Sequence, residues 1–200
     1  MLVVLLGNGL FAPLSALLAL AWARLSNTPW KDLGFVRPAS WLRTVVLGIA
    51  IGVVAKLLMK AVVMPLLGAD PVNQQYAEIA GNLRAVPAMV LFIVVGSGFG
   101  EETVYRGFLF ERLGKLFGST RGAALLILLL TSAWFAAVHF SSQGVAGVQQ
   151  AFLLGILLGS LYLATRQLWL PMMVHAAFNL TALGLIFWQL EARVATFIFS

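Results

Sequence analysis

Six apolar segments, each about 20 residues long and separated by short polar loops, limit what this chain can fold into. A segment of this length crosses the hydrocarbon core of a bilayer as a helix, because the bilayer offers no water to unpaired backbone groups. The chain is 61% hydrophobic and 10% charged, whereas soluble domains are roughly 45–50% apolar and about 25% charged. We therefore predict an all-α, polytopic transmembrane helix bundle in which residues 1–200 form a single integral membrane domain. The predicted spans are 2–23, 41–67, 86–105, 122–140, 145–165 and 168–190.

Basic residues gather in alternate loops, in the segments 24–43 and 106–121 and near Arg166. Because short basic loops stay in the cytoplasm, we expect these three on the cytoplasmic side and both termini outside. The first apolar segment follows Met1 without a basic leader or a clear cleavage site, so we expect a spanning helix rather than a signal peptide. The net charge of +6 reflects these loops and does not indicate nucleic-acid binding, and the lack of cysteine excludes disulfides and thiolate ligands. The compact chain suggests a bacterial cytoplasmic membrane.

Two adjacent carboxylates, Glu101 and Glu102, follow an uncharged stretch from 86 to 100. A charge at membrane depth costs at least ~2.5–3.5 kcal/mol, so such a pair indicates a functional site when partners are available. Glu102 and Arg106 are four residues apart, with the acid first, which predicts a helical ion pair. Glu101 points about 100° away around the helix and is expected to be the poised carboxylate, suited to general acid–base chemistry. Taken alone, the adjacent pair Glu101 and Glu102 is as compatible with a role in helix packing as with a functional site.

The two histidines of the chain also lie in apolar segments. His139 comes near the end of the fourth segment, a position that by itself is more typical of an interfacial residue. His175 and Asn179 share one face of the last helix, and such stacked polar side chains need partners. Pro171 fits best in the first turn of that helix, so His175 is expected near the N-terminal end, where the macrodipole favours a neutral imidazole.

We expect these polar clusters to meet in one water-filled pocket, because scattered buried polar groups would be more costly. The expected depths of these residues in the membrane conflict with a shared pocket. At ~1.5 Å per residue, straight spans place Glu101 and His175 within about 10 Å of the cytoplasmic side but His139 near the opposite face. The glycine-rich run 96–100 is expected to loosen the third helix before Glu101. Lys56 and Lys60, four residues apart, are expected to extend to the interface.

Three short motifs occur in order along the chain, and together they are specific. They resemble those of the CAAX protease and bacteriocin-processing (CPBP, also ABI) family of intramembrane endopeptidases. The resemblance covers the core 86–190, and the Leu33-Gly34-Phe35 segment also looks like bacterial members. The motifs are Glu-Glu-x-x-x-Arg from Glu101 to Arg106, Phe-x-x-x-His from Phe135 to His139, and His-x-x-x-Asn from His175 to Asn179.

The resemblance implies a CAAX prenyl protease 2-like endopeptidase that acts at the membrane near the C-terminus of a membrane-embedded or lipid-modified protein or peptide. For a bacterial chain, prenylated proteins are not expected as natural substrates. Carried over by motif, Glu101 and His139 would activate the attacking water, and His175 and Asn179 would stabilise the oxyanion. Glu102 and Arg106 would be the ion pair that orients the site.

The role of metal is left open by the motifs. Zinc held by Glu101, His139 and His175 is an alternative, with water in the fourth position. The His-Glu-x-x-His helix of zincins is absent, so we favour a metal-free glutamate–histidine site without a certain cofactor.

Two non-proteolytic functions remain as alternatives. A membrane scaffold or immunity protein would use the polar clusters to hold helices together. A proton-coupled transporter could use them as a relay, although the sequence shows neither duplicated halves nor paired broken helices.

Overall fold

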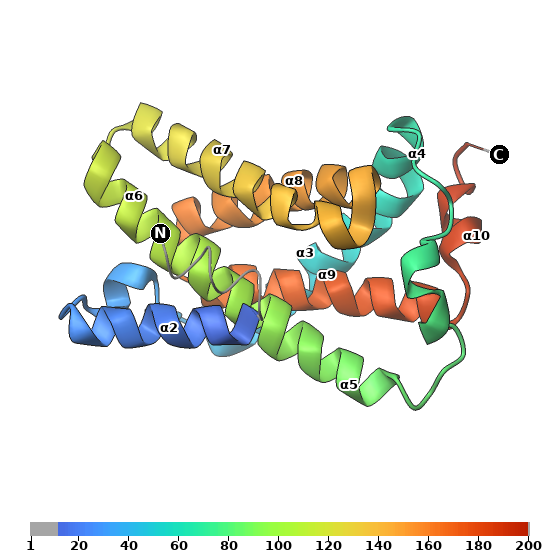
Figure 1. The fold of residues 1–200 in the computed structure, drawn as a ribbon, viewed down its shortest axis with the longest axis horizontal. Helices are drawn as coiled ribbons and strands as arrows, with labels where there is room; N and C mark the ends of the chain where they lie inside the picture. Colours follow the sequence, from blue (N-terminus) through green and yellow to red (C-terminus); the bar gives the residue numbers. More distant parts are fainter. Residues whose placement is uncertain (1–11, 200) are drawn as a thin grey trace.

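The computed structural model describes residues 12–199, and every regular element in that range is helical (Figure 1). Within residues 12–199, five helices are long and apolar enough to cross a membrane, and Pro13–Leu25 is a shorter apolar helix. The five are Trp41–Leu66, Val86–Phe117, Arg121–Val138, Phe140–Thr165 and Trp169–Phe187. The all-α membrane bundle of about six spans is therefore confirmed. Residues 2–11 of the first expected span, and with them the choice between span and signal peptide, lie outside the described residues.

Several of these spans combine more than one kind of helix. π-Helical segments, which have i→i+5 hydrogen bonds, occur in the second and third spans, and in other proteins such segments are frequent at functional sites. Short 3₁₀ segments lie in the connections. In chain order the elements are α2 (Ala12–Leu25), 3₁₀ helix η1 (Trp30–Leu33), α3 (Trp41–Leu58), π-helix η2 (Met59–Val63), α4 (Met64–Leu66), 3₁₀ helix η3 (Gln74–Ile79), α5 (Val86–Leu91), π-helices η4 (Phe92–Glu101) and η5 (Thr103–Leu109), α6 (Phe110–Phe117), α7 (Arg121–Val138), α8 (Phe140–Thr165), α9 (Trp169–Phe187) and α10 (Glu191–Ala195).

The third span is longer than the sequence predicts. It was expected to end at residue 105, before a charged segment, but the helix continues through η5 and α6 to Phe117. Its charges are neutralised within the helix: Arg106 is buried and paired with Glu102, and Glu111 binds Lys115 at 2.6 Å. The polar segment is therefore helical rather than a loop.

This extension resolves the conflict of depths. Glu101 lies 16 residues before the end of α6 at Phe117, and His139 lies 18 residues after the start of α7 at Arg121. The two helices are joined by a short turn, so at ~1.5 Å per residue both side chains lie roughly 24–27 Å from it. The prediction that His139 lies near the opposite face from Glu101 was wrong, because the third helix was taken to end too early.

Close packing places α3 and η4 against α9, which carries the last motif. A Cβ on Gly52 of α3 would lie 2.5 Å from the Val174 carbonyl oxygen, so the two helices touch through their backbones. A Cβ on Gly98 of η4 would lie 3.2 Å from the Ala176 Cβ atom. These small residues bring three helices together around His175.

The connection between the fourth and fifth spans forms a sharp corner. Only His139 separates α7 from α8, and α8 itself is broken at Gly144, which has φ of 60°. Such a φ favours glycine because it has no Cβ. Residues 140–143 therefore form a separate helical turn beside His139, while the straight part of the helix begins near the predicted residue 145.

Candidate active site

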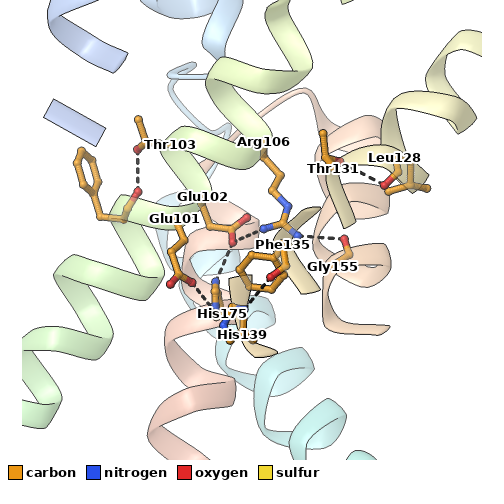
Figure 2. A network of polar contacts seen from close by, with 11 residues as sticks. Glu101, Glu102, Thr103, Arg106, Leu128, Thr131, Phe135, His139, Gly155 and His175 are labelled. Carbon is orange, nitrogen blue, oxygen red and sulfur yellow. Dashed lines mark hydrogen bonds and ion pairs between the residues drawn. The ribbon is translucent and has the colours of Figure 1, made fainter. Parts of the chain in front are cut away.

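Glu102 is the centre of the polar network shown in Figure 2. Its side chain is fully buried, and its Oε1 atom accepts hydrogen bonds from Arg106 Nη1 at 2.8 Å and from His175 Nδ1 at 2.7 Å. Arg106 Nη2 donates a further bond of 3.1 Å to the carbonyl oxygen of Gly155 on α8. The ion pair expected from the i,i+4 spacing is present, and it also connects the third helix to α8 and α9.

His175 has a fixed orientation between the two glutamates. Its Nδ1 atom faces a carboxylate oxygen, so this nitrogen carries the proton and donates a hydrogen bond to Glu102. Its Nε2 atom is thereby directed to the other side, 3.7 Å from Glu101 Oε2. Pro171 lies in the first turn of α9, as expected, and His175 in the second.

The two adjacent glutamates differ in environment. The Glu102 side chain has no exposed surface, whereas the Glu101 side chain is 16% exposed and lines a cavity. Both lie within or beside π-helical segments, at the end of the run Gly96–Gly100 that was expected to loosen the helix. The Glu102 carboxylate thus has a structural role, while the Glu101 carboxylate is accessible to a ligand in the cavity.

His139 is oriented by the end of its own helix. Its Nδ1 atom lies 2.7 Å from the carbonyl oxygen of Phe135, one of the last-turn carbonyls that have no partner within the helix. Nδ1 therefore donates to that oxygen, and Nε2 is left as an acceptor. The Phe135 ring separates the two imidazoles, with its centroid 4.7 Å from that of His139 and 5.8 Å from that of His175.

All four residues expected to carry the chemistry line one cavity of about 640 Å³. Its wall includes apolar side chains from the third and last helices as well as polar ones. Asn179 makes no hydrogen bond through its side chain within the described part of the protein, and Glu101 and His139 share the cavity without a direct bond. These four side chains therefore converge on one pocket, whereas Glu102 and Arg106 do not line it. The four residues are Glu101, His139, His175 and Asn179.

The prediction that Lys56 and Lys60 extend to the interface was wrong. Both are only 7% exposed. Lys56 donates to Gln150 Oε1 at 2.8 Å and also lines the cavity, while Lys60 forms an ion pair of 2.8 Å with Glu191. The buried Glu191 balances the charge of Lys60, and Lys56 has one hydrogen-bond partner, so neither side chain extends to the interface.

Two further cavity residues were not identified from the sequence. Gln143, on the turn before Gly144, donates a hydrogen bond of 3.1 Å to the Tyr76 hydroxyl on η3. Burial raises the pKa of Tyr76, and the negative charge of Glu101 raises it further against the lowering effect of the Gln143 bond. The phenol therefore stays protonated at neutral pH.

The zinc alternative requires that the candidate donors be grouped closely enough to bind one ion. Among residues 12–199, no three histidine, aspartate or glutamate side chains are grouped so that they could hold a metal ion. Glu101, His139 and His175 share the cavity but do not form such a set.

Comparison with known families agrees with the motifs. Residues 83–181 match the family described as type II CAAX prenyl endopeptidase Rce1-like. The chain belongs to this family. The matched residues, about half of the chain, include all three motifs. No curated protein and no solved structure gave a match. At the level of the family, this Rce1-like protein is a CAAX-type intramembrane protease, an integral membrane protein that acts on membrane-associated proteins.

Proposed function

We propose that the protein is an endopeptidase in which Glu101 and His139 activate water and His175 and Asn179 stabilise the tetrahedral intermediate. The observation that carries the proposal is that these four side chains line one cavity while Glu102 holds His175 in place. This arrangement gives separate groups for proton transfer and for oxyanion binding.

Glu101 is the general base. It is a cavity-facing carboxylate without an ion-pair partner among arginines or lysines of the described residues. Glu101 takes a proton from water, and the resulting hydroxide attacks the peptide carbonyl carbon. His139 Nε2 accepts the second hydrogen of that water and orients it. Glu101 then returns its proton to the amide nitrogen as the C–N bond breaks, which leaves a carboxyl group and an amine.

His175 and Asn179 provide the oxyanion donors. A neutral His175 whose Nδ1–H is bound to Glu102 has no second N–H. Donation to the oxyanion therefore requires the imidazolium form, in which Nδ1–H binds Glu102 and Nε2–H binds the intermediate. The Asn179 amide, free of other hydrogen bonds in the described structure, supplies the second donor. A single donor of this kind contributes about 2.7–4 kcal/mol.

The substrate is a membrane-embedded or lipid-modified protein or peptide in a bacterial cytoplasmic membrane. We assign the basic loops, which lie at one end of the bundle in Figure 1, to the cytoplasm because short basic loops stay on that side. The apolar part of the cavity wall, including Ile93 and Leu183, suits an apolar segment of the substrate.

The deciding experiment compares protein termini in membranes of cells that express the wild type or Glu101→Gln at matched levels. Glu101→Gln keeps the shape and hydrogen bonding of the side chain but removes the base. The expected result is a set of peptide ends present with the wild type and with the control Glu78→Gln, at an exposed position of η3, and absent with Glu101→Gln. The same set of ends in all three strains would overturn the proposal and favour a non-enzymatic scaffold.

A further inference from the structure

The cavity extends beyond the proposed catalytic groups to a buried ammonium group. Lys56, on α3, lines the same cavity as His175 and Asn179 and is 7% exposed. Its Nζ atom donates to Gln150 Oε1 at 2.8 Å and lies 5.0 Å from the centre of the Phe178 ring. An ammonium group has three N–H donors, so Gln150 uses only one of them.

The charge of Lys56 is not balanced locally. Glu191, the nearby acid, binds Lys60 at 2.8 Å and accepts the backbone N–H of Asn73 through its other oxygen. Among the described residues, no carboxylate lies within ion-pair distance of Lys56. Glu101, across the cavity, does not form an ion pair with it either. Two lysines thus share a single acid at a depth where an uncompensated charge is costly.

The position of Lys56 relative to His175 determines which part of a bound peptide Lys56 could contact. Phe178, under the ammonium group, follows His175 by three residues on α9, which corresponds to about 4.5 Å along the helix axis. An extended peptide advances about 3.3 Å per residue. An anionic group bound at Lys56 would therefore lie only a few residues from the peptide bond that reaches His175.

We propose that Lys56 and Gln150 form a subsite that binds a carboxylate of the bound peptide. The inference rests on the proposed function, because it takes the ligand of the cavity to be a peptide. The carboxylate belongs either to the free end of the chain or to an acidic side chain a few residues from the cleaved bond. Lys56 supplies the charge, and the amide of Gln150 fixes the ammonium group and supplies a second donor through its nitrogen.

The test measures binding to purified full-length Glu101→Gln, which keeps the cavity but lacks the proposed base. The probes are three fluorescent apolar octapeptides: one with a free C-terminal carboxylate, one with a C-terminal carboxamide, and one carboxamide with a single internal glutamate. We expect at least one carboxylate peptide to bind about tenfold more tightly than the plain carboxamide. Which of the two does so identifies the source of the carboxylate.

Variants in the same Glu101→Gln background assign the preference to Lys56. Lys56→Met should bring the affinity ratio close to one, and Lys56→Arg should retain most of it. Lys115→Met is the control, because Lys115 does not line the cavity and its partner Glu111 keeps a second ion pair with Arg112. A ratio unchanged in Lys56→Met, or no preference for a carboxylate in folded protein, would overturn the subsite.

The proposed endopeptidase activity and the proposed carboxylate subsite can be refuted independently. If peptide ends depend on Glu101 but the affinity ratio is unchanged in Lys56→Met, the endopeptidase stands and the subsite is wrong. If the carboxylate preference depends on Lys56 but no ends depend on Glu101, the cavity binds peptides without cleaving them.

Discussion

At the scale of single residues, Glu102 determines the geometry of the site. One oxygen of its carboxylate binds an arginine on its own helix and a histidine on α9. The other oxygen, like Arg106 Nε, has no hydrogen-bond partner within the described structure. The charge of Glu102 is therefore balanced chiefly by Arg106, in surroundings that exclude water. This burial distinguishes Glu102 from the cavity-facing Glu101.

Replacing Arg106 should destabilise the protein strongly. In Arg106→Met the carboxylate of Glu102 remains buried without its ion-pair partner, and breaking such a pair costs about 3–5 kcal/mol. The loss is measured as reduced thermal stability of the detergent-purified protein. Arg112→Met is the matched control, because Arg112 is partly exposed and its partner Glu111 also binds Lys115. That change should cost no more than about 1 kcal/mol. Equal losses in the two variants would show that Arg106 has no special structural role.

At the scale of helices, the sequence predicted the spans better than their ends. The charges after residue 105 favour an end of the third span there, although an ion pair between Glu102 and Arg106 already requires the helix to continue. The carbonyl of Gly155, which accepts the second bond of Arg106, is 49 residues away and has no signature in the sequence. The π-helical character of η4 was indicated only indirectly, by the glycines before Glu101.

The lysines of the second span also have long-range contacts that the sequence does not indicate. Lys56 and Lys60 have partners 94 and 131 residues away in the chain. A lysine in an apolar helix therefore gives no indication of whether it meets the interface or a distant acid. The motif residues were easier to predict, because their spacing places each pair on one face of one helix. Their shared cavity followed from the cost of burying them separately.

A substitution at Gly52 tests the contact that positions the last motif helix. In Gly52→Ala the new Cβ would lie 2.5 Å from the Val174 carbonyl oxygen and 2.7 Å from the Ala177 Cβ, so α3 and α9 must separate. We expect a loss of about 1–3 kcal/mol in stability together with reduced proteolysis, because α9 carries His175. Thermal unfolding and the wild-type peptide ends give the two measurements. Gly114→Ala in α6 is the control, since a Cβ there meets nothing within 4 Å. A neutral Gly52→Ala would mean that these helices are less closely packed.

At the scale of the whole molecule, the basic loops lie at one end of the bundle and the cavity is lined from the other. The basic turn between α6 and α7 lies at the left in Figure 1, whereas α4 and α10 lie at the right. The cavity is lined from that second end by Tyr76 of η3, Gln143 of α8 and Glu191 of α10. With the basic loops in the cytoplasm, the site would open to the outer face of the membrane. Substrates would then reach it from outside the cell.

The lack of cysteine makes this orientation directly measurable, because any introduced thiol is the only one in the chain. Ser142→Cys places a thiol at the exposed edge of the cavity, and Ser119→Cys places one in the exposed basic turn. On intact cells, a membrane-impermeant maleimide should label Ser142→Cys and leave Ser119→Cys unlabelled, and both should react after permeabilisation. The reverse pattern would place the basic loops outside and open the site to the cytoplasm. The result does not depend on proteolytic activity, so it fixes the side from which substrates enter even before any substrate is known.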